Sequence, residues 1–389
     1  MGRAPRAAII GAGHTRFGVL AESPHRLVRQ AVDQAVASID RGFDREAIEE
    51  IYLASLGFSG WQLGNSSAIA AEEAGRPGVP AVRVENACAS GGFALRQAVD
   101  SIASGRRDLV LVIGLEKMTD VTNARRRYWL GVSGDTEWER LAGLTFAGVY
   151  GLMAARYAAK FGPIREALSE VAVKNHANGA LNPNAHFQKP VTREQASSAP
   201  SVAAPLGLFD CCPVSDGAAA LLVARPEIAR RFTDRPVLVV GTGAGSDHLA
   251  IQERSDVTRL DASRSAAEEA FRHAPFDRKG VDFLEVHDCF TIAELLALED
   301  LGIAERGKAG AMTLAGETRL NGPRPVNPDG GLKAKGHPIG ATGVSQVYEV
   351  FLQLRGQAGA RQIRGAERAL THNVGGSGAS AAVHLFSVG

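Results

Sequence analysis

The sequence predicts an α/β fold built from two similar layered halves. Each half opens with an apolar strand that runs into glycines, at 7–13 and at 237–243. Each half also closes on a glycine-marked strand rich in alanine and valine, at 217–224 and at 379–386. Strand-like and helix-like segments alternate between these ends, which is the pattern of layered α/β proteins. The length, 389 residues, also exceeds what one hydrophobic core usually organises.

The elements follow in the same order in both halves. A helix is predicted after each opening strand, over about 22–40 and over 261–273. Apolar runs at 109–113 and 283–286 are typical of strands buried on both faces of a sheet. The glycines after each opening strand are explained by tight turns. A dinucleotide fingerprint would need a third glycine where the chain has Arg16, so NAD binding is not expected.

A long segment interrupts this alternation. We expect the first half to comprise 1–116 plus 211–230 and the second half to comprise 231–389. The segment 117–210 contains two helix-like stretches, at about 145–161 and 164–178. It is too long for a connection, so an inserted loop subdomain that covers a site is predicted. Its three consecutive arginines at 125–127 fit either a solvated face or contact with a nucleotide phosphate.

Composition and charge exclude several classes of function. The formal net charge is +1, from 43 Lys plus Arg against 42 Asp plus Glu, which gives no overall field for a nucleic acid. No apolar run reaches the ~18–20 residues of a membrane span, and the first residues lack a secretory pattern. We therefore expect a cytoplasmic protein with no nucleic-acid or membrane partner.

The cysteines do not indicate a disulfide framework or a zinc site. They are too few and too scattered for the first and lack the paired spacing of the second. Their positions are Cys88, Cys211, Cys212 and Cys289. A free cysteine is usually a small buried hydrophobe, and this structural role is assigned to Cys211 and Cys212, which precede a buried strand.

Cys88 is the first candidate for chemistry. A short strand at 81–84 ends before it, and a helix is predicted from about 89 to 104. The sulfur would lie near the helix N-terminus, where the peptide dipoles favour a thiolate. Small neighbours leave room for a bulky acyl group. These residues alone leave both a structural and a catalytic role open.

Three histidine-containing blocks are the other candidates. His337 lies in Gly-His-Pro-Ile-Gly before a helix, where the proline and glycines hold it in a rigid turn suited to a general base. His287 and Cys289 directly follow the strand at 283–286, and the ends of such strands usually carry the sites of open α/β sheets. The glycines of 372–378, Gly375 among them, could expose amides to a developing oxyanion. Together with Cys88, these blocks predict one site at the junction of the halves, with a cysteine nucleophile and a histidine base.

These blocks resemble the thiolase family over essentially the whole chain. The segment Asn-Ala-Cys-Ala-Ser-Gly around Cys88 is similar to the family's nucleophile block, and the block around His337 is similar to its Gly-His-Pro motif. The strand that begins Ser-Asp-Gly-Ala-Ala-Ala at 215 also resembles the family. His-Asp-Cys-Phe at 287–290 resembles the sterol-carrier-protein type of thiolase in particular. The resemblance implies a duplicated α-β-α-β-α fold with an inserted loop subdomain.

The chain departs from the better-known thiolases at two places. Those proteins carry Asn-Glu-Ala-Phe where this chain has 287–290, and a C-terminal Cys-x-Gly where it has Asn373-Val374-Gly375. In the sterol-carrier-protein type, the resemblance assigns the second thiol to the His-Asp-Cys-Phe block. It therefore implies Cys289 as the second reactive thiol.

The resemblance implies an activity and a role for each residue. Cys88 would attack a 3-oxoacyl-CoA, with His337 as base and with His287 and His337 as donors to an enolate oxygen. Cys289 would protonate the enolate, and the amides of Cys88 and Gly375 would hold the tetrahedral oxyanion. No cofactor is implied, and coenzyme A is the cosubstrate. Asp288 fits either an orienting role or a turn.

Rival functions and partners stay open at this point. Other enzymes of the same superfamily condense malonyl units or act as retro-aldolases on CoA-ester side chains. A non-catalytic acyl-CoA or lipid carrier, or a scaffold subunit, is the alternative outside catalysis. The resemblance implies a homodimer or homotetramer, and a small partner subunit is a further alternative.

Overall fold

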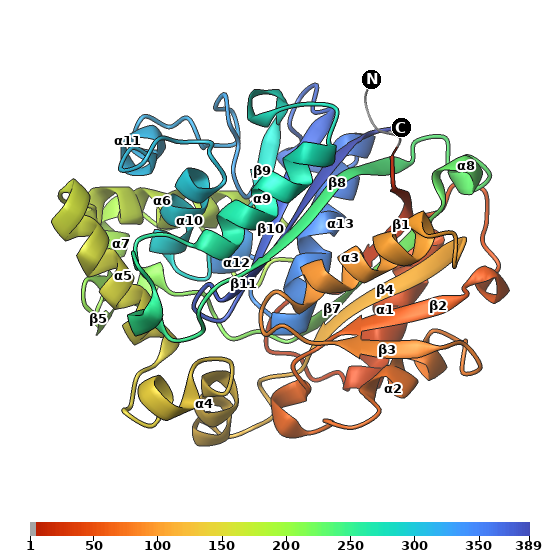
Figure 1. Cartoon of the computed structure of the whole chain (residues 1–389), viewed down its shortest axis with the longest axis horizontal. Coiled ribbons are helices and arrows are strands. Elements are labelled where there is room, and N and C mark those ends of the chain that lie inside the picture. The colour runs from red at the N-terminus through yellow and green to blue at the C-terminus, as the bar shows by residue number, and fades with distance from the viewer. Residues whose placement is uncertain (1–4) are drawn as a thin grey trace.

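A sheet of nine strands forms the centre of the computed structural model, which describes residues 5–389 (Figure 1). The strands lie in the order β3-β2-β4-β7-β1-β8-β11-β10-β9. Their bounds are β1 Ala7–His14, β2 Glu50–Ala54, β3 Ala81–Val84, β4 Leu109–Glu116, β7 Gly217–Ala224, β8 Val237–Ser246, β9 Phe283–Glu285, β10 Arg368–Gly375 and β11 Ser380–Val388.

The sheet confirms that the two halves share one plan. In the first half, β2 is parallel to β4, β4 is antiparallel to β7, and β7 is antiparallel to β1. In the second half, β9 is parallel to β10, β10 is antiparallel to β11, and β11 is antiparallel to β8. β1 and β8 pair with each other, with Ala7 opposite Val239, and so join the halves.

Helices form three layers around these strands, as the α-β-α-β-α prediction requires. In the middle, α3 (Ser90–Ala103) and α13 (Thr342–Arg355) pack on strands of both halves (Figure 1). The outer helices of the first half are α1 (Pro24–Ala37), α2 (Ser66–Glu73) and α8 (Pro226–Ala229). Those of the second half are α9 (Asp261–His273) and α10 (Thr291–Asp300). Apolar side chains bury themselves between these layers, which is what stabilises such folds.

The glycines of the opening strands serve a different purpose from the one predicted. They lie inside β1 and β8, and not in turns after them. A Cβ on Gly13 would lie 2.1 Å from the carbonyl oxygen of Ala31 in α1, and one on Gly243 would lie 2.0 Å from that of Ala266 in α9. Glycine is needed because each helix crosses its strand at backbone contact distance.

The inserted segment packs on the second half. It contains α4 (Asn123–Gly131), α5 (Phe146–Phe161), α6 (Arg165–Gly179), α7 (Arg193–Ser197) and the hairpin of β5 (Ser201–Ala203) with β6 (Leu206–Gly207). α5 and α6 share a hydrophobic core with α10, and α6 also contacts α11 (Ala309–Leu314) and α12 (Gly331–Ala334). The two long helices begin and end within one residue of the predicted bounds. The domain boundaries at 116, 210 and 230 stay a prediction.

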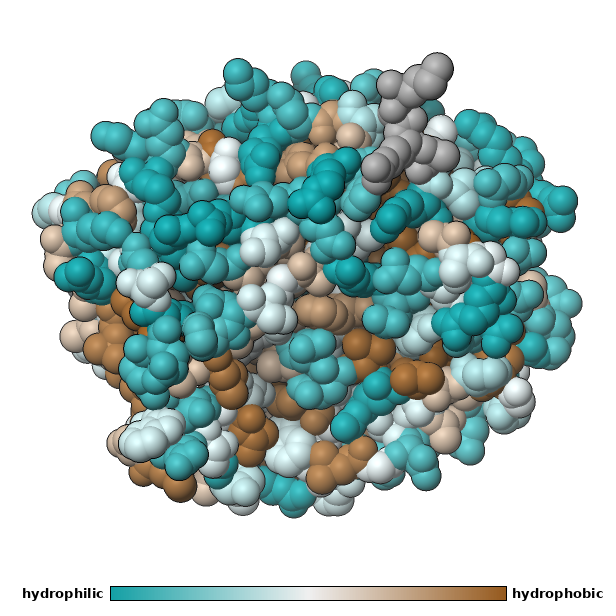
Figure 2. Space-filling view, in the orientation of Figure 1, coloured by the Kyte–Doolittle hydropathy of each residue, from teal (hydrophilic) through white to brown (hydrophobic). Residues whose placement is uncertain are grey.

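The surface is mainly hydrophilic on the face viewed in Figure 2, with apolar side chains gathered on its lower part, over the region of α4 and β3. Large apolar side chains are exposed in the corresponding parts of the chain, namely Trp61, Leu63, Val82, Tyr128 and Trp138. Of the helices within residues 5–389, none is both long and apolar enough to cross a membrane.

Candidate active site

Cys88 lies in a tight turn between β3 and α3, as predicted. Ala87 before it has a φ of +48°, a conformation that costs a residue with a Cβ some free energy. Two hydrogen bonds hold this turn. The carboxylate of Glu85 accepts from the amide of Ala87 at 2.6 Å, and the hydroxyl of Ser90 donates to the carbonyl of Ala87 at 2.6 Å. The turn therefore fixes where Cys88 points.

Two predicted histidines meet Cys88 from the other half of the molecule. One ligand-type atom from each of Cys88, His287 and His337 lies within 4.8 Å of the others. The two imidazole rings are 5.1 Å apart and perpendicular, with an interplanar angle of 87°. β9 positions His287, and the turn before α13 positions His337. The structure thus brings together three residues that are distant in sequence.

A glycine contact sets the spacing of this cluster. Gly91 in the first turn of α3 touches Gly343 in the first turn of α13, because a Cβ on Gly91 would lie 2.8 Å from the Cα of Gly343. Cys88 precedes the first of these helices and His337 precedes the second. The starts of both middle helices therefore meet backbone to backbone beside the site.

Hydrogen bonds determine which ring nitrogen of His337 carries the proton. Its Nδ1 lies 2.7 Å from the hydroxyl of Thr342, and that hydroxyl donates its own proton to the carbonyl of Pro338 at 3.0 Å. The hydroxyl can then only accept from the ring, so Nδ1 carries the proton. Nε2 of His337 is left with a free lone pair, which is what a general base requires.

Asn373 assigns the opposite tautomer to His287. The amide oxygen of Asn373 accepts from the backbone N–H of Gly92 at 2.9 Å, so its nitrogen is the donor on the other side. That nitrogen donates to the carbonyl of Cys88 at 2.9 Å and lies 3.2 Å from Nδ1 of His287. Nδ1 of His287 therefore accepts, and Nε2 carries the proton. His287 is a hydrogen-bond donor where His337 is an acceptor.

This tautomer pattern suits proton transfer better than metal binding. Within residues 5–389, the cluster of Cys88, His287 and His337 is the one place where three potential metal ligands converge. A metal would need a lone pair on Nε2 of His287. Because Nδ1 of His287 accepts from Asn373, the ring proton is on Nε2. The same proton is well placed to stabilise a developing oxyanion.

The resting thiol is neutral, contrary to the thiolate that its place before a helix predicted. Burial raises the pKa of Cys88 to about 12, against a hydrogen bond from the amide of Gly376 that lowers it. Burial and the charge of Lys335 lower the pKa of His337 to about 3. Desolvation outweighs the helix dipole here, so the pair is a neutral thiol beside a neutral imidazole. For Cys88 to act as a nucleophile, a neighbouring base would have to take its proton.

The turn between β10 and β11 supplies amides to the same sulfur. The predicted Gly375 ends β10, and the next residue, Gly376, has a φ of +60°. It is the N–H of Gly376 that donates to the Cys88 sulfur. A Cβ on Gly376 would also lie 2.7 Å from the carbonyl of Ser133. His372 does not join the cluster, because its Nε2 bonds to the hydroxyl of Ser263 at 2.8 Å.

Cys289, the predicted second thiol, is buried near Cys88. Burial and the nearby thiols of Cys212 and Cys88 raise the pKa of Cys289 well above its ordinary value, whereas a hydrogen bond with Tyr150 lowers it. The carbonyl of Cys289 also accepts from the amide of Cys212 at 3.0 Å. Cys211 is partly buried, and its carbonyl accepts from the Lys333 ammonium at 2.6 Å.

Asp288 holds the loop that leads to His337. Its carboxylate accepts from the amides of Leu332 and Lys333 at 2.7 and 3.2 Å and from the side chain of Asn175 at 2.7 Å. Burial and the charge of Glu294 raise the pKa of Asp288 to about 7. Of the two roles predicted for Asp288, these contacts favour the orienting one.

Glu116, at the end of β4, is a buried residue that the sequence analysis missed. Its carboxylate accepts from the amides of Leu56, Phe58 and Gly340 at 2.8, 2.8 and 3.1 Å. Burial raises the pKa of Glu116 to about 7. It ties the first half to the Gly-His-Pro turn. A glutamate that ends a continuous apolar strand was the available signal.

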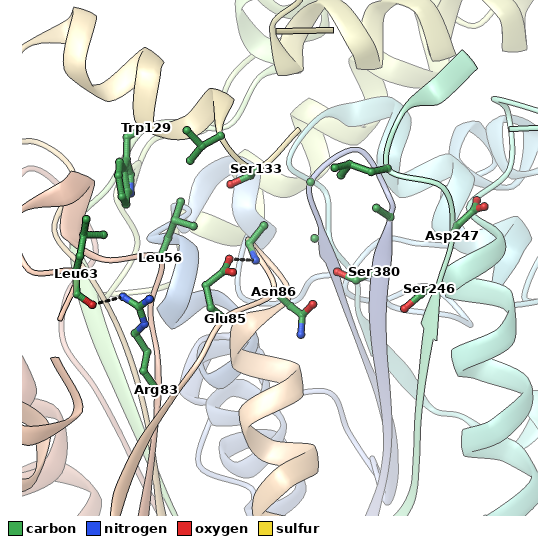
Figure 3. Close-up of a pocket in the computed structure, with 16 residues that line it drawn as sticks. Leu56, Leu63, Arg83, Glu85, Asn86, Trp129, Ser133, Ser246, Asp247 and Ser380 are labelled. Carbon is green, nitrogen blue, oxygen red and sulfur yellow. Dashed lines mark hydrogen bonds between the residues drawn. The ribbon is translucent and has the colours of Figure 1, made fainter. Parts of the chain in front are cut away.

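A pocket of about 530 Å³ opens beside Cys88 (Figure 3). Glu85, Asn86 and Ala87 of the Cys88 turn and Gly375 and Gly376 of the β10–β11 turn line it. Figure 3 shows Leu63, Arg83 and Trp129 on one side and Ser246, Asp247 and Ser380 on the other. The pocket thus reaches the turn that carries Cys88.

The predicted arginines do not line this pocket. Arg125 donates to the carbonyls of Ser59 and Gly60 at 3.2 and 3.1 Å. Its guanidinium also lies 5.7 Å from the ring of Trp61. These contacts favour a solvated face that braces a neighbouring loop over contact with a phosphate.

Comparison with known proteins identifies the family. The model of the thiolase N-terminal domain matches residues 7–227, and that of the thiolase C-terminal domain-like family matches 243–388. An acetyl-CoA acetyltransferase of Methanothermobacter thermautotrophicus is 44% identical, over 98% of this chain and 99% of its own. Sterol carrier protein 2 of Gallus gallus is 31% identical, over 99% of this chain and 72% of its own.

Solved structures share the fold. A structure described as an Ltp2–ChsH2(DUF35) aldolase superimposes with a TM-score of 0.85 at 24% identity, over 98% of this chain and 97% of its own. The human mitochondrial 3-ketoacyl-CoA thiolase gives a TM-score of 0.73 at 18% identity, over 99% of each chain. With the family models and the full-length relatives, the chain belongs to the thiolase family and is an acyltransferase of the thiolase type.

Proposed function

We propose that this chain catalyses the CoA-dependent cleavage of a 3-oxoacyl-CoA to acetyl-CoA or propionyl-CoA and a shortened acyl-CoA, or the reverse Claisen condensation. The observation that carries the proposal is the cluster of a neutral Cys88 thiol, a basic Nε2 on His337 and a donor Nε2–H on His287. The name of the relative that is 44% identical, acetyl-CoA acetyltransferase, supports this substrate class.

The first half-reaction transfers the acyl group to Cys88. Nε2 of His337 takes the thiol proton as the sulfur attacks the 3-keto carbon. The bond between C2 and C3 then breaks, and its electrons form the enolate of acetyl-CoA. The N–H of His287 and the newly protonated His337 face the enolate oxygen, and Cys289 gives its proton to the enolate carbon.

The second half-reaction returns the enzyme to its starting state. The thiolate of Cys289 takes the proton of an incoming CoA thiol, and the CoA sulfur attacks the thioester carbon on Cys88. The bond between that carbon and the Cys88 sulfur then breaks, which releases the shortened acyl-CoA, and the Cys88 thiolate takes back its proton from His337. The amides of Cys88 and Gly375 hold the tetrahedral oxyanion in this proposal. The amide of Gly376, which bonds to the sulfur, supports the placement of donors there. No metal or redox group enters either step, and CoA is the cosubstrate.

The pocket beside Cys88 fits this role. Its volume of about 530 Å³ and its direct access to the Cys88 turn suit the part of an acyl-CoA that leads to the thioester. Trp129 and Leu63 offer apolar contact, and Arg83 offers charge.

The test is a cleavage assay on a panel of 3-oxoacyl-CoAs that differ in chain length and branching. Acetyl-CoA and the shortened acyl-CoA should appear in equal amounts, and only when free CoA is present. Formation of acetyl-CoA without consumption of CoA would contradict the proposal. The panel also identifies the preferred chain.

A retro-aldolase that acts on a CoA-ester side chain is the second candidate, because the structure of an aldolase shares the fold with a TM-score of 0.85. Such an enzyme would release an aldehyde or ketone without using the Cys88 thiol. Alkylation of Cys88 by iodoacetamide separates the two, since it should abolish thiolysis and spare an aldolase. A non-catalytic acyl-CoA carrier would bind the panel without turnover.

We further propose that the chain forms a homodimer or homotetramer. β3 is an edge strand whose Val82 is 49% exposed, and apolar side chains lie exposed nearby along the chain. Sedimentation velocity measures the assembly directly, and a single monomeric species would contradict it. A small partner subunit and a cytoplasmic location stay predictions.

A further inference from the structure

Tyr150 reaches the second thiol from the inserted segment. It lies on α5, is 1% exposed, and its ring stacks on that of Phe290 with centroids 4.7 Å apart. Phe290 is the residue after Cys289. The Tyr150 hydroxyl donates to the carbonyl oxygen of Gly376 at 3.3 Å, and it lies close enough to the Cys289 thiol to lower the pKa of that thiol. The inserted helix α5 thus contacts both the segment that carries Cys289 and the β10–β11 turn beside Cys88.

We propose that Tyr150 is a positioning residue that stabilises the thiolate of Cys289 while the proton is away from it. The inference rests on the proposed function, in which Cys289 gives a proton to an enolate and later takes one from CoA. Between these steps the sulfur carries a full negative charge in a buried site. A hydrogen bond to a charged group is worth more than one to a neutral group.

The surroundings of Cys289 otherwise oppose that charge. Burial raises the pKa of Cys289 most, and the neighbouring groups Cys212, Cys88 and Asp288 raise it further. The hydrogen bond from Tyr150 lowers it. Burial also raises the pKa of Tyr150 well above its ordinary value, so its hydroxyl keeps its proton and stays a donor.

The single proton of this hydroxyl has two acceptors in reach. While Cys289 is a neutral thiol, the carbonyl of Gly376 can accept it at 3.3 Å. When Cys289 loses its proton to the enolate carbon, rotation of the O–H about the C–O bond turns it toward the sulfur. No proton leaves Tyr150 in either state, and no oxidation occurs.

Gly376 also connects this tyrosine to the nucleophile. Its carbonyl lies by the Tyr150 hydroxyl, and its amide donates to the Cys88 sulfur. A change at Tyr150 that merely disturbed this turn would therefore affect acylation of Cys88 as well. Loss of the thiolate contact alone would spare acylation.

The test compares Tyr150→Phe with Tyr157→Phe. Tyr157 lies on the same face of α5, is also buried, and donates to Glu299 away from the site. Glu299 keeps the amides of Gly307 and Ala309 as partners in that variant. Two steps are measured separately in each protein. Acylation of Cys88 by acetyl-CoA is followed by intact-protein mass, and the Cys289 step by loss of deuterium from acetyl-CoA labelled in its methyl group.

Tyr150→Phe should slow deuterium loss by about 10- to 100-fold and leave acylation of Cys88 within about twofold. The pH at which deuterium loss reaches half its maximal rate should move upward by about one to two units, because the thiolate is harder to form. Tyr157→Phe should change neither step. Unchanged deuterium loss and an unchanged pH profile in Tyr150→Phe would overturn the inference, as would an equal loss of both steps.

Cys289→Ala separates this inference from the proposed function. If Cys289→Ala abolishes deuterium loss while Tyr150→Phe leaves it intact, only the role of Tyr150 is overturned. If Cys289→Ala retains normal deuterium loss, the proposed role of Cys289 is overturned and the role of Tyr150 with it.

Discussion

The two halves of the sheet share strand order and direction, but their strand ends carry different residues. In the second half, the ends of β9 and β10 carry His287, Cys289 and Asn373, all of which lie near Cys88. The equivalent ends of β2 and β4 in the first half carry Leu56 and Glu116, and the Glu116 carboxylate accepts from the amides of Leu56 and Gly340. In the proposed function, the first half contributes the nucleophile and a scaffold, and the second half contributes the proton-transfer groups.

The same arrangement of strands can therefore carry different kinds of residue at its strand ends. A strand end in an open sheet offers unpaired amides and a place for a polar side chain. In the second half those positions carry groups that donate or accept protons. In the first half they carry a carboxylate that holds amides of both halves. Substitutions in either half test this division.

The largest effect is expected at Cys88, the one reactive group of the first half. Cys88→Ala should lower turnover by at least about 10⁴-fold, since loss of a nucleophile removes the covalent path. Intact-protein mass after incubation with acetyl-CoA should show no added acetyl group. An acetylated Cys88→Ala protein would place the nucleophile elsewhere.

Next in size is Cys289 of the second half. Cys289→Ala should lower turnover by about 10²- to 10⁴-fold, which is the usual contribution of a positioned acid or base. Cys88 should still become acetylated, because its base is His337. Exchange between acetyl-CoA and acetoacetyl-CoA measures the loss. Normal exchange in this variant would show that both proton transfers use other groups.

Glu116 tests whether the first half acts as a scaffold. Its pKa of about 7 lies above the 4.5 of an exposed glutamate, so its contribution to stability is fully present below about pH 4.5 and is lost as pH rises through about 7. The shift corresponds to about 3 kcal/mol. Glu116→Gln should therefore flatten the dependence of unfolding free energy on pH between these values.

Urea unfolding of the wild type and Glu116→Gln across this pH range provides the measurement. Parallel curves would mean that Glu116 is already ionised at low pH in the folded protein. The variant should keep Cys88 reactive, because the carboxylate does not contact the sulfur in the described hydrogen-bond network.

The smallest effect is expected at the ion pair between Arg96 of α3 and Glu269 of α9. The guanidinium bonds to both carboxylate oxygens at 3.1 and 3.2 Å, but both side chains are partly exposed. Arg96→Ala should lower the unfolding free energy by about 1 kcal/mol or less, and by less in high salt.

Arg29→Ala is the matched control, because Arg29 pairs with Glu73 inside the first half. Equal small losses would show that packing of the layers, and not this ion pair, holds the two halves together. A much larger loss for Arg96→Ala, measured by urea unfolding, would assign the ion pair a real part in joining them.

Much of the fold could be predicted because it depends on local patterns. The helix predicted at 261–273 has these bounds in the structure. The one predicted at 22–40 begins later because Ser23 caps it and Pro24 starts it, and it ends earlier, at Ala37. The role of the strand glycines could not be predicted, because it depends on how closely a separate helix crosses them.

The residues of the candidate site could also be predicted from local patterns, but their protonation could not. Cys88, His287, His337 and Cys289 stand in short motifs at strand ends or helix starts, and the structure brings the first three into one cluster. The tautomers were not predictable, since Asn373 reaches the carbonyl of Cys88 across 285 residues of sequence. A single hydrogen bond from a distant amide decides which ring nitrogen of His287 holds the proton.

The contact between Gly91 and Gly343 has a consequence for the motion of the site. Side chains exchange rotamers continually, but two main chains in van der Waals contact have no rotamer to exchange. The spacing between the starts of α3 and α13 is therefore a stiff length that thermal motion changes little. In the proposed function, this stiff spacing would keep the thiol and its base at a fixed separation, and only protons and one hydroxyl would have to move.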